Sequence, residues 1–127
     1  MANLLLVDDD PVLLDLIARL LRRAGQSVTL ANTAAEGVTL AHTQPFDVII
    51  TDVMMPDTDG YAFTRQLRER LPSTQTRILI FTARLQGPDQ ALAREAGADA
   101  CMMKTVNVER LNTMIESLLN TENPGLG

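Results

Sequence analysis

The chain of 127 residues contains few aromatic side chains, a single cysteine and a single lysine. Aromatic residues make up only 3%, so a buried core must be built from Leu, Ile, Val, Met and Ala. One cysteine excludes an internal disulfide and favours a reducing compartment. No apolar run approaches the roughly 20 residues that cross a bilayer, and no charged-then-apolar leader opens the chain. We therefore expect a cytoplasmic protein without a membrane-spanning segment.

The charge balance is acidic, with a net charge of -5 and a pI near 4.7. An acidic surface argues against nucleic acid or an anionic membrane as a direct partner. The length and the hydrophobic content of 46% are those of one globular domain. We expect that domain over residues 1–120. Residues 121–127, which are polar with Pro and Gly, are expected to form a flexible tail or a truncated linker.

Short apolar runs alternate five times with segments of helical periodicity, which predicts an α/β sheet with crossover helices. The expected strands lie near residues 3–7, 27–31, 46–51, 77–81 and 99–103. The first, third and fourth of these are continuous aliphatic runs, as expected of parallel strands buried on both faces.

The first helix has clear start and stop signals, with Asp10 as N-cap, Pro11 at its first position and Gly25 after its end. Its predicted buried stripe consists of Leu13, Leu16, Ile17, Leu20, Leu21 and Ala24. The second helix is expected to start at a capping box, Thr33–Glu36, and to stop before Pro45. The third is expected to follow Asp59–Gly60 and to run to about Leu71. The fourth and fifth are expected from Gly87–Pro88 to Gly97 and from about Val106 to Leu119.

Polar side chains stand where the predicted strands end. They are Asp8 and Asp9, Asp52, Thr82, and Lys104, which is the only lysine beside ten arginines. Because parallel strands end at the same edge of a sheet, where open α/β sheets place their chemistry, these groups are expected to meet. Three carboxylates facing an ammonium and a hydroxyl suit a divalent metal ion and a phosphoryl group.

Asp8 and Asp9 have a purely structural interpretation as partners of a helix N-terminus. Asp10 already fills the cap, however, and grouped carboxylates repel one another unless a hard divalent cation offsets the repulsion. A metal site that includes Asp52 is therefore favoured. Pro56 and Gly60 shape the loop after Asp52, and the backbone carbonyl of Met54 is a candidate further ligand.

These residues resemble a known family. The segments that carry the resemblance are Val7-Asp8-Asp9-Asp10-Pro11, residues 51–60, Phe81-Thr82-Ala83, and Gly97-Ala98-Asp99 leading to Lys104. Their order and spacing closely resemble a bacterial two-component response-regulator receiver domain, and the resemblance covers about residues 2–120. It implies a doubly wound, flavodoxin-like parallel sheet of five strands in the order 2-1-3-4-5. Five helices would cover it, two on one face and three on the other.

The resemblance also implies roles. Asp52 would accept a phosphoryl group from a phosphohistidine on a sensor histidine kinase or phosphotransfer protein. Asp9, Asp52 and the Met54 carbonyl would hold Mg²⁺, with Asp8 helping directly or through water, and Lys104 would neutralise phosphoryl charge. Thr82 would move toward the phosphoryl oxygen and signal to an effector protein or a fused effector domain. The chain would catalyse only its own aspartyl phosphorylation and dephosphorylation.

Two positions depart from the family pattern. Thr105 follows Lys104 where receivers usually have a proline after a cis bond, so we predict a trans bond and a re-routed loop. Cys101 stands where most receivers carry an aromatic residue. We therefore expect signalling to run through Thr82 and the loop of residues 83–88, with the start of the fourth helix as the moving part.

Two other functions fit parts of the pattern. In a haloacid-dehalogenase-type phosphohydrolase, Asp8 and Asp10 would form the Asp-x-Asp motif and Asp8 would be the nucleophile. That chemistry needs a late acidic pair, which no residues after Lys104 supply. A flavin-binding module would need a Ser-, Thr- or Gly-rich phosphate loop after the first strand, where an acidic run would repel the phosphate.

Overall fold

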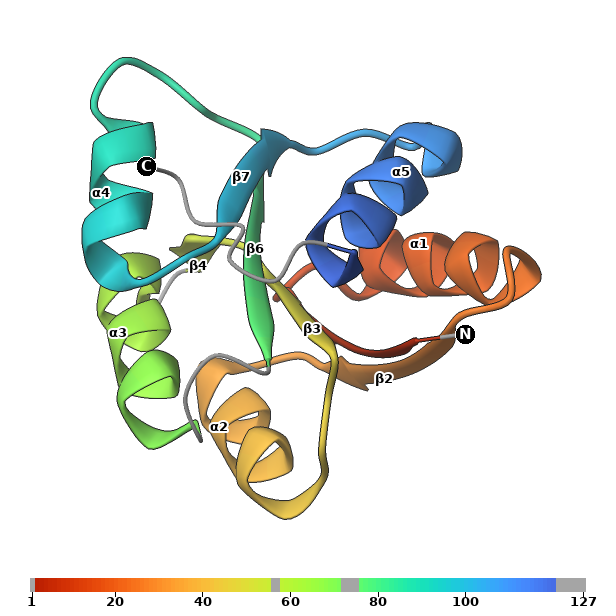
Figure 1. The fold of residues 1–127 in the computed structure, drawn as a ribbon, viewed down its shortest axis with the longest axis horizontal. Coiled ribbons are helices and arrows are strands. Elements are labelled where there is room, and N and C mark those ends of the chain that lie inside the picture. Colours follow the sequence, from red (N-terminus) through yellow and green to blue (C-terminus); the bar gives the residue numbers. More distant parts are fainter. Residues whose placement is uncertain (1, 56–57, 72–75, 121–127) are drawn as a thin grey trace.

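The computed structural model describes residues 2–55, 58–71 and 76–120. The strands are β1 (Asn3–Val7), β2 (Ser27–Ala31), β3 (Val48–Thr51), β4 (Met54–Met55), β5 (Thr58–Asp59), β6 (Arg77–Thr82) and β7 (Ala100–Met103). The helices are α1 (Pro11–Arg23), α2 (Ala34–Thr43), α3 (Gly60–Arg70), α4 (Asp89–Ala96) and α5 (Val108–Leu119). Apart from the short strands β4 and β5, which the sequence did not predict, the strands and helices alternate as predicted (Figure 1). The predicted tail, residues 121–127, lies outside the described residues.

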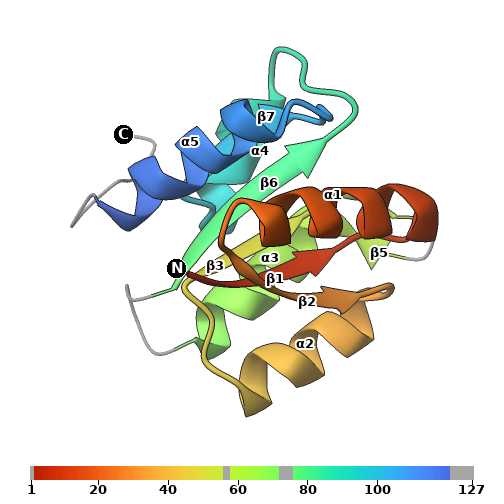
Figure 2. The same cartoon turned by 90° about the vertical axis from the view of Figure 1, so that its right-hand side faces the viewer.

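Five parallel strands form one sheet in the order β2-β1-β3-β6-β7. Without the short β4 and β5, this is the predicted order 2-1-3-4-5, which is confirmed. The register places Val7 beside Ala31 and Thr51, and Thr82 beside Met103. Figure 2 shows β1 and β6 ending toward the same side of the molecule. We call this the carboxyl edge of the sheet, and the opposite edge, where the strands begin, the amino edge.

Helices cover both faces of the sheet, with α1 and α5 on one side and α2, α3 and α4 on the other (Figure 1). Alternate residues of each strand join one of two apolar clusters. Leu4 and Leu6 pack with α1 and α5, whereas Leu5 and Val7 pack on the other face. Burial of one such side chain contributes about 1.5–3 kcal/mol, so the two clusters hold the strand ends in fixed register.

The start of α1 is as predicted, but its buried stripe is partly wrong. Asp10 accepts hydrogen bonds from the amides of Val12 and Leu13 at 3.1 and 3.2 Å. The residues of α1 that are buried are Leu14, Ile17, Ala18 and Leu21. Leu16 is 42% exposed and Ala24 is also exposed. Leucines on two adjacent stripes of this helix satisfy the same periodicity, and the rotation of α1 against the sheet decides which stripe is buried.

The segment after Asp52 is more ordered than a loop. Met54 and Met55 pair with Asp59 and Thr58 in the short antiparallel β4–β5 hairpin. A side chain at Gly60 would place its Cβ 2.1 Å from the Cα of Val53, so only glycine permits this close approach. Pro56, which was expected to shape the segment, lies outside the described residues.

No helix in the described part of the chain is both long and apolar enough to cross a membrane.

Candidate functional site

The carboxyl edge brings the predicted polar residues together. Asp8 and Asp52 directly follow β1 and β3, and their amides donate to Ala31 and Val7, which continues the sheet hydrogen bonding past the strand ends. Only 5% of Asp8 and 4% of Asp52 is exposed, whereas Asp9 is exposed to solvent. Two carboxylates are thus buried next to each other, an arrangement that is costly without a compensating cation.

Lys104 supplies a compensating cation. Its ammonium lies 2.5 Å from Asp8 Oδ2 and 2.7 Å from Asp52 Oδ2, and its amide donates to the carbonyl of Thr82 at 2.8 Å. Burial lowers the pKa of Lys104, but its hydrogen bonds with Asp52 and Asp8 outweigh burial and raise that pKa above its ordinary value. Burial raises the pKa of Asp8, and the opposing hydrogen bond with Lys104 does not cancel that effect. The sequence predicted a lysine at this edge, but not its direct contact with Asp8.

The three carboxylates form a group that fits a hard divalent cation. Asp8, Asp9 and Asp52 each offer one oxygen, and these oxygens lie within 4.8 Å of one another. Oxygen ligands with a total of three negative charges are the donor set that Mg²⁺ and Ca²⁺ select. The amide of Met54 donates to Asp52 Oδ1 at 3.0 Å, so the backbone of Met54 lies directly beside the group. Whether the Met54 carbonyl is a ligand stays a prediction.

Thr82 ends β6 and is fully buried. Within the described residues its Oγ1 has no hydrogen-bond partner. Leaving a buried hydroxyl unsatisfied costs about 1–3 kcal/mol, so this group suits a ligand oxygen that is absent from the free protein. The sequence placed Thr82 at this edge, and the missing partner is new information from the structure.

The two departures from the family pattern also have structural counterparts. The described residues contain no cis peptide bond, so the predicted trans bond between Lys104 and Thr105 is confirmed. Thr105 Oγ1 accepts from the amide of Asn107 at 3.0 Å, and this contact shapes the loop that enters α5. Cys101 is partly buried on β7, on the same face of the sheet as Tyr61 of α3.

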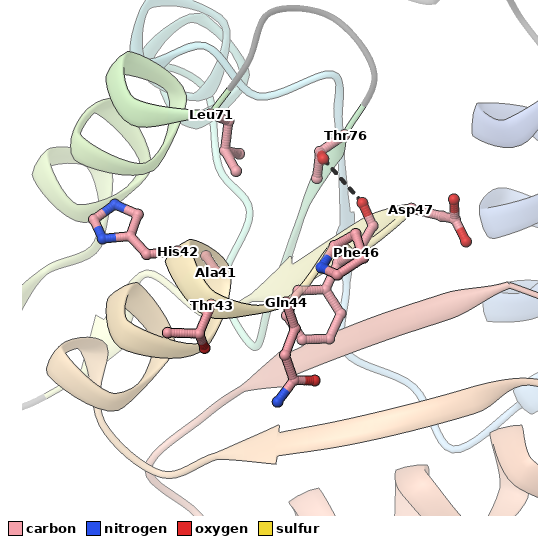
Figure 3. A pocket seen from close by; sticks show the side chains of 9 residues that line it. Ala41, His42, Thr43, Gln44, Phe46, Asp47, Leu71 and Thr76 are labelled. Carbon is pink, nitrogen blue, oxygen red and sulfur yellow. Dashed lines mark hydrogen bonds between the residues drawn. The ribbon is translucent and has the colours of Figure 1, made fainter.

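A hollow of about 380 Å³ lies at the amino edge, away from these residues (Figure 3). It is lined by Ala41, His42, Thr43, Gln44, Pro45, Phe46, Asp47, Leu71 and Thr76. The hydroxyl of Thr76 donates to the carbonyl of Phe46 at 2.9 Å, and Asp47 accepts from the amide of Asn3. Thr76 and Asp47 are therefore engaged in holding the fold, and none of the predicted site residues lines the hollow.

Comparisons with known proteins agree with the site. A model of the response regulator receiver domain matches residues 4–116. Protein PilH of Pseudomonas aeruginosa is 31% identical over 119 residues, with 94% of this chain and 98% of PilH covered. The structure is similar to that of chemotaxis protein CheY4 of Vibrio cholerae, with a TM-score of 0.88, 30% identity, and 94% and 99% of the two chains covered. A BeF3-activated DrrB receiver domain gives a TM-score of 0.80 at 28% identity, with 95% and 99% covered.

Other relatives are longer than this chain. The transcriptional regulatory protein GlrR of Escherichia coli is 32% identical over 123 residues, which are 97% of this chain but 27% of GlrR. The chain also spans 54% of the response regulator ArlR of Staphylococcus epidermidis. These matches give no support to the haloacid-dehalogenase alternative. The chain belongs to the response regulator receiver domain family and is a receiver domain of a two-component signalling system.

Proposed function

We propose that Asp52 is the residue that accepts the phosphoryl group. The observation that carries this proposal is the position of its carboxylate, which is buried beside Asp8 and Asp9 and contacts the Lys104 ammonium at 2.7 Å. In the proposed reaction a bond forms between an Asp52 carboxylate oxygen and phosphorus. The bond between phosphorus and the imidazole nitrogen of the donor breaks, and its electron pair remains on that nitrogen.

Lys104 is placed to act on the transferred group. Its raised pKa keeps the ammonium protonated at neutral pH, so it carries a full positive charge beside the Asp52 carboxylate. A fixed cation next to developing oxygen charge is the main way in which proteins assist phosphoryl transfer. We assign this charge neutralisation to Lys104, together with a hydrogen bond from Thr82 Oγ1 to a phosphoryl oxygen.

Mg²⁺ is the metal ion proposed for the acidic group. Asp8, Asp9 and Asp52, with the Met54 carbonyl, are the residues that would hold it, and when bound it neutralises charge on the phosphoryl oxygens. In the free protein Lys104 occupies one oxygen of both Asp8 and Asp52. The metal ion would therefore share the carboxylates of Asp8 and Asp52 with the Lys104 ammonium.

The phosphodonor in this proposal is a protein. Segments that begin or end at the carboxyl edge expose large apolar side chains, namely Val12, Met54, Met103 and Val106. Apolar groups around a polar centre suit a protein domain that covers the site during transfer. A sensor histidine kinase or phosphotransfer protein in the cytoplasm fits this requirement. The output partner would be an effector protein or a fused effector domain.

Incubation of the chain with acetyl phosphate and Mg²⁺ tests the proposal. We expect a mass increase of about 80 Da, the mass of one phosphoryl group, on the peptide that contains Asp52. A generic phosphomonoester should not be turned over. Stable labelling of a peptide that lacks Asp52, or sustained phosphomonoester hydrolysis, would overturn the assignment.

A further inference from the structure

The start of α4 is held by hydrogen bonds that the phosphoacceptor site does not use. The Tyr61 hydroxyl on α3 donates to Asp89 Oδ1 at 3.0 Å. Asp89 Oδ2 accepts from the amide of Gln86 at 2.6 Å, and the amide of Asp89 donates to the carbonyl of Gln86 at 2.7 Å. Asp89 is only 9% exposed. These contacts tie α3 to the loop of residues 83–88, which directly follows Thr82.

The two ends of α4 are held differently. At its C-terminal end, Arg68 donates to the carbonyls of Gly97 and Thr76 at 3.0 and 2.9 Å and to the carboxylate of Asp99 at 2.6 Å. Charge-assisted bonds of this kind are strong and geometrically specific. At the N-terminal end the N-cap Pro88 provides no side-chain hydrogen bond. Tyr61 therefore attaches the N-terminal end through one hydrogen bond, whereas Arg68 attaches the C-terminal end through several, so release of Tyr61 would leave the C-terminal end of α4 held.

Tyr61 also lies on the face of the sheet that holds Cys101, the position that departs from the family pattern. Both side chains pack against the same apolar cluster. Burial, followed by the hydrogen bond to Asp89, raises the pKa of Tyr61 to about 12. The phenol therefore keeps its proton at neutral pH and remains a hydrogen-bond donor to Asp89.

We propose that Tyr61 and Asp89 form a latch that holds residues 83–88 in the unphosphorylated protein and releases them when Thr82 engages the phosphoryl group. The latch rests on the proposed function, because Thr82 is its trigger. A shift of Thr82 pulls on the chain that leads to Gln86, whose amide and carbonyl are both hydrogen-bonded to Asp89. The loop can follow only if Asp89 moves with it and leaves Tyr61.

The energies of the two contacts make this exchange feasible. The buried hydroxyl of Thr82 gains a hydrogen bond to the phosphoryl group, and Asp89 loses one from Tyr61. Without the phosphoryl group only the latched state makes one of these two bonds, whereas with it each state makes one, so phosphorylation removes the preference for the latched state. Tyr61 and Asp89 are thus positioning residues that act on Thr82 through the loop. Cys101 on β7 has no aromatic ring with which to respond to Thr82, and in this proposal Tyr61 on α3 supplies the response.

The chain offers a direct probe of the latch, since Tyr61 is its only tyrosine. Tyrosine labelled with ¹³C at Cζ gives a single NMR resonance, and bound beryllofluoride gives separate ¹⁹F signals. With Mg²⁺ and beryllofluoride we expect the Tyr61 resonance to shift. Local opening of residues 83–88 then no longer has to break the Tyr61–Asp89 bond, so amide exchange of Gln86 should accelerate by about tenfold, which corresponds to one hydrogen bond of ordinary strength.

Tyr61→Phe removes the hydroxyl and keeps the ring. We expect the amide of Gln86 in the ligand-free variant to exchange as fast as in the beryllofluoride-bound natural protein, and phosphorylation by acetyl phosphate to become several-fold faster. A merely structural role would lower stability without raising that rate. The control Asn112→Ala removes the 2.8 Å bond between Gln26 and Asn112 near the amino edge and should change neither quantity.

The outcomes separate the latch from the proposed function. Bound beryllofluoride with an unchanged Tyr61 resonance and unchanged exchange at Gln86 overturns the latch alone. The latch is likewise overturned if Tyr61→Phe leaves both Gln86 exchange and the phosphorylation rate as they were. If no ¹⁹F signal of bound beryllofluoride forms in the presence of Mg²⁺, the phosphoacceptor assignment fails and the release of the latch fails with it.

Discussion

Asp47 and Asp52 flank the two ends of the same strand, β3, and differ in their burial and in their bonding partners. Asp47, at the amino edge, is half-buried, and its carboxylate accepts from the amide of Asn3 at 2.8 Å. Asp52, at the carboxyl edge, is buried beside Asp8 and in contact with Lys104. The hollow in Figure 3 lies beside Asp47 and not beside Asp52. A candidate site is therefore identified here by buried charge, and not by open volume.

The difference follows from the direction of the chain. At the amino edge of a parallel sheet, side chains can complete the hydrogen bonding of strand amides, as Asp47 does for Asn3. At the carboxyl edge, successive strands bring side chains from distant parts of the sequence to one place. The carboxylate at the first edge completes the sheet, whereas those of Asp8 and Asp52 at the second edge accept from neighbouring amides and leave their other oxygens to Lys104.

The largest expected effect is the loss of phosphorylation in Asp52→Asn, with Asp47→Asn as the matched control. Asparagine at position 52 lacks the nucleophilic carboxylate, so incubation with acetyl phosphate and Mg²⁺ should give no adduct of about 80 Da. Asp47→Asn should be labelled like the natural protein. Intact-protein mass spectrometry measures both. Labelling that persists in Asp52→Asn, or disappears in Asp47→Asn, would remove the functional distinction between the two edges.

Asp9→Asn tests the metal group without touching the nucleophile. Asp9 is exposed, so its replacement should change the metal-free free energy of unfolding by no more than about 0.5 kcal/mol. Any change should be stabilising, because one of three neighbouring negative charges is removed. Phosphorylation that depends on Mg²⁺ should be abolished. Thermal unfolding and labelling over a range of Mg²⁺ concentrations give both quantities, and a natural response to Mg²⁺ in this variant would exclude Asp9 as a ligand.

Lys104→Met should lower the metal-free free energy of unfolding by about 3 kcal/mol. This loss is at the lower end of the range for a broken buried ion pair, because Asp8 can take up a proton in place of the lost ammonium. The variant should recover more stability from millimolar Mg²⁺ than the natural protein does, since the metal no longer competes with the ammonium. Denaturant unfolding measures both effects.

Arg19→Met is the matched control for Lys104→Met. It breaks the exposed ion pair of Arg19 with Asp15, whose side chains are 72% and 54% exposed, and should cost less than about 0.5 kcal/mol. Equal losses in the two variants, or equal responses to Mg²⁺, would show that Lys104 does not hold the carboxylates together.

The smallest expected effect is a pH dependence of stability that arises from Tyr61. Its pKa is raised from 10.0 to about 12, by burial first and then by Asp89, with Cys101 adding to the rise and Arg84 opposing it. The folded state therefore holds the phenolic proton more tightly than the unfolded state. That contribution to stability is fully present below pH 10 and is lost as the pH rises toward about 12.

Absorbance at 295 nm follows the ionisation of this tyrosine alone, because the chain has no other tyrosine and no tryptophan. The midpoint should lie near 12 while circular dichroism still reports the fold, and Asp89→Asn should move it part of the way toward 10, because burial remains. A midpoint at 10 in the folded natural protein would show that Asp89 does not hold the phenol.

Most of the helices and strands could be predicted from the sequence because the signals that determine them are local. The N-cap at Asp10, the capping box at Thr33, confirmed by the 3.1 Å bond from the amide of Glu36, and the glycine at the end of α4 each act within a few residues. Strand order and the gathering of the acidic residues, Thr82 and Lys104 at one edge then follow from the alternation of strands and helices. These predictions needed no knowledge of which side chains touch.

The sequence could not predict which of two similar helix faces is buried, or which distant side chains make contact. Burial of Leu14 in place of Leu16 depends on the rotation of α1 against the sheet, which periodicity alone leaves open. The contact of Lys104 with Asp8 spans most of the chain, and the contact of Tyr61 with Asp89 joins residues 28 positions apart. Tyr61 in the first turn of α3 and Asp89 at the first position of α4 carry no local signal that they meet.

Among the described residues the hydroxyl of Thr82 has no hydrogen-bond partner, and this limits how far phosphorylation can shift the conformation of the domain. A ligand shifts an equilibrium between two conformations only by the difference in its affinity for them. If one hydrogen bond from Thr82 is that difference, its worth of about 1–3 kcal/mol changes the ratio of the two conformations by roughly 5–150-fold. Such a ratio is graded, so a downstream partner would read the fraction of phosphorylated molecules rather than an all-or-none state.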